Sequence, residues 1–282
     1  MSATDLSSLR GRSVVVTGST RGFGRVLAGR LAGLGARVVV SGPVPEESRE
    51  YAEELTKRGD DAVWSVGDVT SGTDVDAILA TAVEHYGHVD VWVNNAAYET
   101  PGMSTLLEFP PEVWERTTQV NVLGTGRCTI AALTHMRARG RGVIVNVTGR
   151  GDDLRPTKFS APYGASKAWV RAFTKTLRAE YADSGVHLVA FNPGIMTTAR
   201  MDRAHFTQHS DAHDRTEKQL EAMTRMFGDP PEVAAEQLIA FLASGQAAKR
   251  KELRLINPVR IAKGLGGEAV HQAANLRDKR RR

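Results

Sequence analysis

Short apolar runs alternate along the chain with stretches of helical periodicity. The runs are rich in Val and Ile and apolar at successive positions, which is typical of parallel strands covered by helices on both faces. They predict strands at Ser13–Thr17, Arg37–Ser41, Ala62–Val66, Val89–Val93, Gly142–Val147 and Val186–Phe191, with a short seventh near Leu253–Ile256.

The stretches between these runs carry apolar residues at helical spacing. One apolar stripe consists of Phe23, Val26, Leu27, Leu31 and Leu34. A second stripe covers residues 165–177, and another helix is expected at Pro231–Leu242. This succession predicts an α/β fold, a doubly wound Rossmann fold whose seven-stranded, mostly parallel sheet has helices on both faces.

Two segments interrupt the alternation. Residues 195–227 are polar and follow the carboxyl end of the sixth strand, where a substrate lid is expected. Residues 265–282 are rich in Gly, Ala and Arg, and we expect a poorly ordered basic tail there. Because no repeat or linker divides the remainder, residues 1–264 are predicted to form a single domain.

The composition favours a soluble cytoplasmic protein. The 282 residues are 41% hydrophobic and 24% charged, as is usual for a globular chain with a substantial core. No apolar run approaches the ~20 residues of a membrane-spanning helix, and Met1–Arg12 lacks the apolar region of a secretory signal. Cys128 is the only cysteine, so no internal disulfide can form, in keeping with a reducing compartment.

The formal net charge of +5 comes largely from the end of the chain. The last six residues carry +4, which leaves the rest close to neutral. A nucleic-acid-binding surface spreads basic residues over a folded face, whereas a terminal run of charge is usually solvated. We therefore predict neither a nucleic-acid nor a membrane partner.

A glycine-rich turn follows the first predicted strand and opens the first helix. After Thr17 it reads Gly18, Ser19, Thr20, Arg21, Gly22, Phe23 and Gly24. Glycine is needed where a turn is tight and where backbone N–H groups approach a pyrophosphate at a helix N-terminus. In this strand–helix context the turn predicts a dinucleotide site at residues 18–24.

The end of the second strand bears on which dinucleotide binds. An acidic side chain there would hold the 2′-hydroxyl of the NAD ribose, but the chain reads Val40-Ser41-Gly42-Pro43. Arg21 can instead meet a 2′-phosphate, whose oxygens match the fork of the guanidinium group. We therefore predict NADPH/NADP+ as the cofactor, with Ser41 beside it.

Tyr163 and Lys167 lie four residues apart, on one face of a predicted helix. A phenol titrates near ~10, so proton transfer near neutral pH requires a lowered pKa. A nearby cation favours the phenolate, although the full shift takes on the order of 4 kcal/mol and an oxidised nicotinamide ring would supply part of it. The pair is predicted to form the reactive centre.

Five motifs together resemble one known family. The glycine turn, Asn94-Asn95-Ala96-Ala97, Asn121, Tyr163-x-x-x-Lys167 and Asn192-Pro193-Gly194 occur in the order and spacing of the short-chain dehydrogenase/reductases. The resemblance covers roughly residues 9–242. It implies a doubly wound seven-stranded fold, a nicotinamide cofactor, and a homodimer or homotetramer.

The resemblance also implies roles for single residues. Lys167 would hold the nicotinamide ribose and acidify Tyr163, and Asn121 would support a proton-relay water near Lys167. Three glycines would line the pyrophosphate: Gly18, Gly22 and Gly24. The other implied cofactor contacts are Asp68 and Val69 at the adenine, Asn95 and Ala96 at the adenosine ribose, and Pro193, Gly194, Ile195 and Thr198 at the nicotinamide amide.

The chain departs from the family at the end of the fifth strand. The family usually has a Ser there that donates a hydrogen bond to the substrate carbonyl, and the aligned position is Gly149. Losing one such donor typically costs ~2.7–4 kcal/mol of transition-state stabilisation. Thr148 can compensate if the strand turns at this point, as a fourth catalytic residue, or Arg150 can do so from the following loop. Alternatively, the substrate carries its own activation, as a hydrogen-bonded phenolic ketone or a quinone does.

Three histidines recur every four residues in the predicted lid, namely His205, His209 and His213. A helix would place them on one face, where they could bind a metal, contact substrate or form polar surface. Because metal ligation by histidines needs a supporting shell, we predict no metal site.

The leading hypothesis is an NADPH-dependent reductase of a small-molecule ketone, with an aromatic or polyketide-like substrate favoured. The 28 Arg residues against 9 Lys associate the chain with GC-rich genomes, in which such enzymes of secondary metabolism are common. A second hypothesis is altered chemistry on the same fold: imine, alkene or quinone reduction, dehydration or isomerisation. A third is a non-catalytic NADPH-binding protein, which has no need of Tyr163, Lys167 and Asn121 together.

Overall fold

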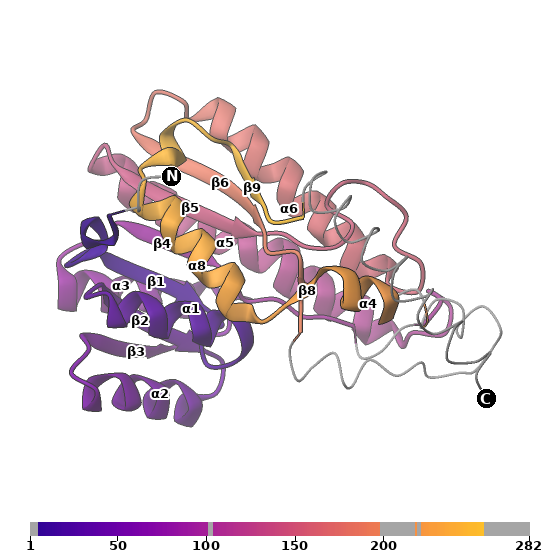
Figure 1. Cartoon of the computed structure of the whole chain (residues 1–282), viewed down its shortest axis with the longest axis horizontal. Coiled ribbons are helices and arrows are strands. Elements are labelled where there is room, and N and C mark those ends of the chain that lie inside the picture. The colour runs from indigo at the N-terminus through magenta and orange to yellow at the C-terminus, as the bar shows by residue number, and fades with distance from the viewer. Residues whose placement is uncertain (1–4, 101–103, 198–217, 219–220, 257–282) are drawn as a thin grey trace, which may run out of the picture.

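A parallel sheet of seven strands lies at the centre of the molecule, with helices on both faces (Figure 1). This computed structural model describes residues 5–100, 104–197, 218 and 221–256. The strand order is β3-β2-β1-β4-β5-β6-β9, and each neighbouring pair is parallel. The order of connection reverses between β1 and β4, and ligands of such sheets bind in the crevice at the carboxyl ends of the strands beside this reversal. The predicted doubly wound fold is confirmed.

The strands follow the apolar runs closely. They are β1 (Ser13–Thr17), β2 (Arg37–Gly42), β3 (Ala62–Val66), β4 (Val91–Asn94), β5 (Gly142–Val147), β6 (Val186–Asn192) and β9 (Glu252–Arg254). Only β4 begins more than one residue away from its predicted start. It begins at Val91, so Val89 and Asp90 lie before the strand. The seventh strand is three residues long and ends two residues before the predicted end.

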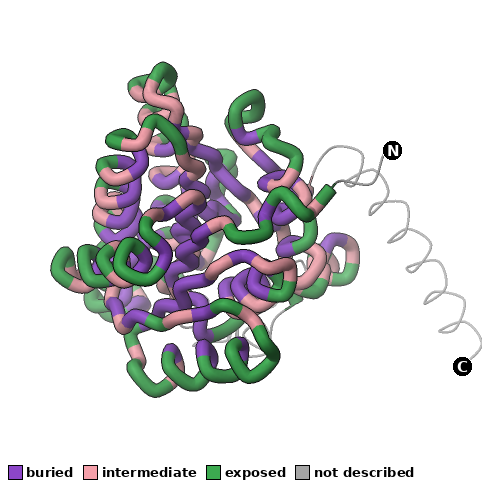
Figure 2. The backbone as a smooth tube through the Cα atoms, turned by 90° about the vertical axis from the view of Figure 1, so that its left-hand side faces the viewer, coloured by how far each residue is buried: buried purple, intermediate pink, exposed green. Residues whose placement is uncertain are grey.

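The helices cover the sheet in two layers. They are α1 (Gly22–Gly33), α2 (Pro45–Lys57), α3 (Gly72–Tyr86), α4 (Pro111–Thr117), α5 (Thr125–Ala138), α6 (Ala161–Glu180) and α8 (Pro231–Ala243). Apolar residues of α1, α2 and α8 form one core with one face of the sheet, and those of α3 and α5 form a second core with the other face. Figure 2 shows the buried strands between helices whose outer sides are exposed.

Two local features were not predicted. A π-helical segment, η2 (Thr118–Gly124), joins α4 to α5 and contains Asn121; such segments are frequent at functional sites. The ends of the predicted lid are paired, because β7 (Ile195–Met196) lies parallel to β8 (Gly228–Asp229). The described residues on either side of most of the predicted lid therefore lie next to each other.

Several predictions fall outside the described residues. These are Thr198, the three lid histidines and the basic tail at 265–282. Across the described part of the chain, no helix combines the length and apolar character needed to cross a membrane.

Candidate active site

The glycine turn joins the first strand to α1 and is held against the end of β4. Gly18 has φ +63° and Gly22 has φ +55°, values that favour glycine. The Asn95 amide donates to the carbonyls of Thr17 (2.9 Å) and Gly18 (3.0 Å). A side chain at Gly24 would overlap that same amide. Asn95 therefore ties β4 to β1 at the point where the strand order reverses.

The start of α1 has the features of an anion site. The first amide groups of a helix lack partners within the helix, and in the described structure no side chain of the N-cap residue Arg21 caps them. A Cβ placed on Gly22 would meet no described atom within 4 Å. Free amide donors beside open space at a helix N-terminus fit the pyrophosphate of a dinucleotide.

Other predicted contacts at this turn have mixed surroundings. Ser19 is fully buried and lies against the end of β2, where its hydroxyl accepts from the Ser41 amide at 2.9 Å. The Phe23 ring packs in the core, 5.8 Å from that of Phe191, so only its backbone can serve a ligand. Thr20 and Arg21 both contact the carboxylate of Glu47 on α2, at 3.0 Å and 3.2 Å. Sequence reasoning did not identify Glu47.

The predicted adenine contacts, Asp68 and Val69, follow β3. Burial raises the pKa of Asp68, but hydrogen bonds from the Thr70 amide and Arg116 outweigh it and hold that pKa below its usual value. Val69 is buried against Gly124 of η2. Asp68 thus has a clear structural role in its own turn, whether or not a nucleotide binds.

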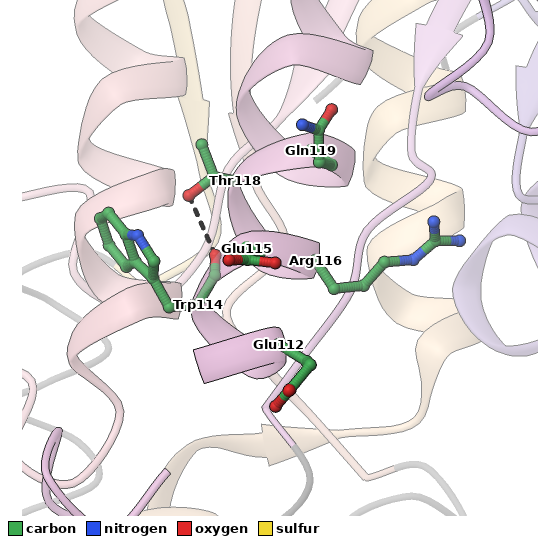
Figure 3. A pocket seen from close by; sticks show the side chains of 6 residues that line it. All are labelled: Glu112, Trp114, Glu115, Arg116, Thr118 and Gln119. Atoms are coloured by element: carbon green, nitrogen blue, oxygen red, sulfur yellow. Dashed lines mark hydrogen bonds between the residues drawn. The ribbon is translucent and has the colours of Figure 1, made fainter. Parts of the chain in front are cut away.

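Arg116 also belongs to an open hollow on α4 and η2 (Figure 3). Its lining residues are Glu112, Trp114, Glu115, Arg116, Thr118 and Gln119. None of them belongs to the predicted catalytic set. The predicted catalytic residues Tyr163 and Lys167 lie elsewhere, on the first turns of α6 beside the end of β5.

Tyr163 and Lys167 lie on the first turns of α6, as predicted. The Lys167 ammonium group is 5.6 Å from the centre of the Tyr163 ring and donates to the Val147 carbonyl at 3.0 Å. Lys167 is only 4% exposed. Burial lowers its pKa to about 8, although the charges of Glu99 and Asp152 act in the opposite direction. A positive charge is thus held beside the phenol, in the arrangement that favours phenolate.

Asn121 supports this helix through its side chain. Its amide accepts from the Tyr98 amide (2.7 Å) and donates to the Tyr98 carbonyl (2.9 Å) and to the Ser166 hydroxyl (2.9 Å). Ser166 in turn donates to the Tyr163 carbonyl at 2.7 Å. The Asn121 side chain therefore fixes α6 against the segment after β4, which leaves only its backbone for the predicted relay water.

Gly149 faces the hydroxyl of Tyr163. A Cβ built on Gly149 would lie 2.7 Å from that hydroxyl. That distance is too short for a real Cβ, so a side chain at position 149 would collide with the hydroxyl. The glycine therefore lets the Tyr163 hydroxyl lie directly against the end of the fifth strand.

The Thr148 hydroxyl, which is expected to replace the serine if the strand turns here, is bonded to other groups of the protein. Its hydroxyl donates to Asp152 at 2.6 Å and lies 3.2 Å from the Phe191 carbonyl. Thr148 follows the last residue of β5, and its backbone amide still donates to the Phe191 carbonyl of β6 at 2.8 Å. The backbone has therefore not yet turned away from β6. The structure therefore places the Thr148 hydroxyl in a support for the loop.

Asp152 is the centre of that support, and the sequence offered no motif for it. It is 3% exposed and accepts from Thr148, from Asn192 (2.9 Å) and from both terminal nitrogens of Arg254 (2.9 Å each). Asn192 also donates to the Gly149 carbonyl at 3.2 Å and accepts from the Gly194 amide at 2.9 Å. Asp152 thereby joins the loop after β5 to the predicted nicotinamide contacts at Pro193, Gly194 and Ile195.

Arg150 lies near Tyr163, although the residue as a whole remains exposed. Desolvation by the surrounding protein lowers the pKa of its guanidinium group, while charge interactions with Tyr163 and Glu99 raise it. Glu99 was not predicted, but its position directly after the Asn94–Ala97 motif was a usable signal. The charge of Arg150, which directly follows Gly149 in the chain, therefore interacts with Tyr163.

Comparisons with known proteins show what this chain is similar to. The sequence matches the family described as short chain dehydrogenase over residues 12–209. It is 35% identical over 242 residues to 3beta-hydroxysteroid dehydrogenase 1 of Eggerthella lenta, covering 85% of this chain and 89% of that protein.

Two further similar proteins bear on the chemistry. The granaticin polyketide synthase putative ketoacyl reductase 2 of Streptomyces violaceoruber is 36% identical over 224 residues, covering 78% of this chain and 85% of that one. A gluconate 5-dehydrogenase from Burkholderia cenocepacia, solved in complex with NADP and tartrate, has a TM-score of 0.77 at 26% identity. That likeness covers 91% of this chain and 98% of the solved one.

Removing the Asp152 carboxylate should destabilise the fold. Asp152→Ala leaves Arg254, Asn192 and Thr148 without their shared acceptor, and breaking such a buried pair costs about 3–5 kcal/mol. Urea unfolding followed by circular dichroism measures the free energy of unfolding. Asp153→Ala is the control, because Asp153 is exposed and pairs only with Arg155 among the ion pairs of the described residues. Equal losses in the two variants would contradict the role of Asp152.

Below pH 8, the buried Lys167 side chain should lower the free energy of unfolding. Because the pKa of Lys167 is lowered to about 8, the unfolded state binds more protons between that pH and ~10.4. The penalty is therefore full below pH 8 and is lost as the pH rises. The stability advantage of Lys167→Met over the wild type should shrink by about 2 kcal/mol between about pH 7.5 and 9.5. Lys175→Met, exposed on the same helix, should show no such trend; a flat Lys167→Met difference would refute the prediction.

Proposed function

The chain belongs to the short-chain dehydrogenase family, and from this premise we propose that it is an NADPH-dependent reductase of a small-molecule ketone. The observation that carries the proposal is the Tyr163 hydroxyl, which lies beside Gly149 on a helix that also holds the buried Lys167 ammonium group. Both lie at the carboxyl ends of the strands, near the glycine turn.

The residues divide the chemistry simply. NADPH, when bound, supplies the hydride that reduces the carbonyl carbon. The Tyr163 hydroxyl donates its proton to the carbonyl oxygen, so that the C=O group becomes CH–OH and the phenolate remains. Lys167 stabilises that phenolate by its positive charge, and Asn121 holds the helix on which both side chains lie.

The Arg150 guanidinium group donates the hydrogen bond to the substrate carbonyl that the family's serine would otherwise donate. Position 149 has no side chain, and the Thr148 hydroxyl is bound to Asp152. Arg150 interacts electrostatically with Tyr163, and a guanidinium group donates strong, charge-assisted hydrogen bonds to an oxygen that gains negative charge. This supports Arg150 as the second donor to the substrate carbonyl.

The cofactor preference rests on Arg21 and the start of α1. The glycine turn fits a pyrophosphate, and Arg21 precedes Gly22 at the helix N-terminus, where it can meet the 2′-phosphate. The similar gluconate 5-dehydrogenase was solved with NADP. These points support NADPH as the reductant.

The glycine at position 149 also bears on the substrate class, because the exposed Arg150 replaces the serine only in part. An aromatic or polyketide-like ketone with an internal hydrogen bond polarises its own carbonyl and depends less on a serine. The similarity to the granaticin polyketide synthase putative ketoacyl reductase 2 of Streptomyces violaceoruber supports this class. The same observation favours quinone or imine reduction as a second candidate, because those groups are already electrophilic.

We further propose a cytoplasmic homodimer or homotetramer. Leu123 of η2 and Ile130 of α5 are exposed apolar side chains about two helical turns apart, and exposed apolar side chains that gather on a surface favour association.

The function is tested by NADPH oxidation against a panel of aromatic ketones, quinones and imines. We expect turnover of at least one ketone, and Tyr163→Phe should lower kcat by at least about 100-fold because the proton donor is lost. NADPH binding should persist in this variant, as followed by nucleotide fluorescence. Undiminished ketone turnover by Tyr163→Phe would refute the mechanism, and binding without turnover of any compound would favour a non-catalytic role.

Two substitutions next to Gly149 distinguish the candidate donors. Arg150→Ala should lower kcat by about 100-fold or more, as expected for loss of one oxyanion donor. Thr148→Val should leave kcat within about threefold and lower the free energy of unfolding by about 1–3 kcal/mol, because Asp152 loses a buried donor. Steady-state kinetics and urea unfolding give the two quantities. The reverse pattern would assign the role to Thr148.

A further inference from the structure

The end of β2 and the glycine turn are hydrogen-bonded to each other, and the surface beside this junction is formed by both. The Ser19 amide donates to the Ser41 carbonyl at 2.9 Å, and the Ser41 amide donates to the Ser19 hydroxyl at 2.9 Å. In a doubly wound sheet, the group at the end of the second strand meets the 2′-position of the adenosine ribose. This surface is therefore where NADPH and NADH are distinguished.

The strand itself brings no charged group to this surface. Ser41 is buried, and its hydroxyl oxygen has no hydrogen-bond partner within the described structure. Gly42 follows it, and a Cβ there would lie 2.7 Å from the Thr20 methyl group. Charge at the 2′-position must therefore come from neighbouring elements.

Two oppositely charged side chains reach the expected 2′-position from different elements. Arg21 comes from the glycine turn and Glu47 from the first turn of α2. The Arg21 guanidinium group lies 3.2 Å from the Glu47 carboxylate, which also accepts from the Thr20 hydroxyl at 3.0 Å. Thr20 is buried, so its hydroxyl fixes the carboxylate beside the turn.

This ion pair is open to a ligand. The side chains of Arg21 and Glu47 are 70% and 42% exposed, and exposed pairs of this kind are weak. A 2′-phosphate carries between one and two negative charges near neutral pH. This phosphate would compete with Glu47 for Arg21 and would be repelled by the Glu47 carboxylate. The 2′-hydroxyl of an NADH ribose can instead donate a hydrogen bond to that carboxylate.

We infer that Glu47 is a specificity-determining residue that narrows the preference of this chain for NADPH over NADH. The inference rests on the proposed nicotinamide cofactor. Arg21 favours the phosphate of NADPH, and Glu47 opposes it from the same surface. The wild-type protein accordingly binds both NADPH and NADH. The difference between the two Kd values is smaller than it would be if Arg21 acted without Glu47.

Nucleotide fluorescence titrations of the full chain test this inference without relying on turnover. Glu47→Gln should lower the Kd for NADPH by about three- to tenfold, the effect of removing one exposed charge near the phosphate. The Kd for NADH should stay the same or rise by up to about threefold. The gain for NADPH should shrink as the salt concentration rises from about 0.05 to 0.5 M, because salt screens exposed charges.

Glu46→Gln is the matched control. Glu46 has the same charge in the same first turn of α2 and is exposed, so its substitution reproduces the change in net charge and in the helix terminus. The ratio of the two Kd values should not change in this variant. An unchanged ratio in Glu47→Gln, or an equal change in both variants, would overturn the inference and leave the proposed function standing. Failure of the wild type to bind either nucleotide would overturn both.

Discussion

Burying a lysine ammonium group disfavours its charged form. The Lys167 ammonium group is buried in this way, and much of the described site surrounds it. The Val147 carbonyl accepts from it, and the charges of Glu99 and Asp152 oppose the effect of burial. These groups come from the ends of β4 and β5 and from the loop beyond. The cation beside Tyr163 therefore depends on several strand ends being held together, so the reactive centre is a property of the whole sheet edge.

Side-chain amides and one carboxylate hold these strand ends. Asn94 donates to Asn146 (2.7 Å) and to Thr129 (2.9 Å), and Asn146 donates to Thr174 of α6 at 2.9 Å. These groups are buried, and a satisfied buried network gives a defined geometry, since any unpaired member would be costly. Asp152 serves the same purpose between β5, β6 and β9. Gly149 and the neighbouring Tyr163 hydroxyl thus lie in a rigid surrounding, which suits the positioning of a substrate beside them.

The nucleotide end of the crevice is organised differently. Its buried part is backbone and small side chains, with Ser19 and Ser41 exchanging hydrogen bonds. Its charged part, Arg21 and Glu47, is exposed and lies on helix termini, where a ligand can rearrange it. The rigid end is suited to positioning the reacting atoms and the exposed end to choosing between related nucleotides.

The sequence by itself determined the strands, the glycine turn, the Tyr163–Lys167 pair and the glycine at position 149. Each is local, since periodicity and spacing depend on neighbouring residues. Tertiary structure alone decided which distant groups meet there. Glu47 reaches Arg21 through the turn into α2, and Arg254 reaches Asp152 across 102 positions. The Thr148 hydroxyl bonds to Asp152, while the Thr148 amide still donates to Phe191 just beyond the end of β5. Such contacts arise from crossovers between strands, and no spacing in the chain records them.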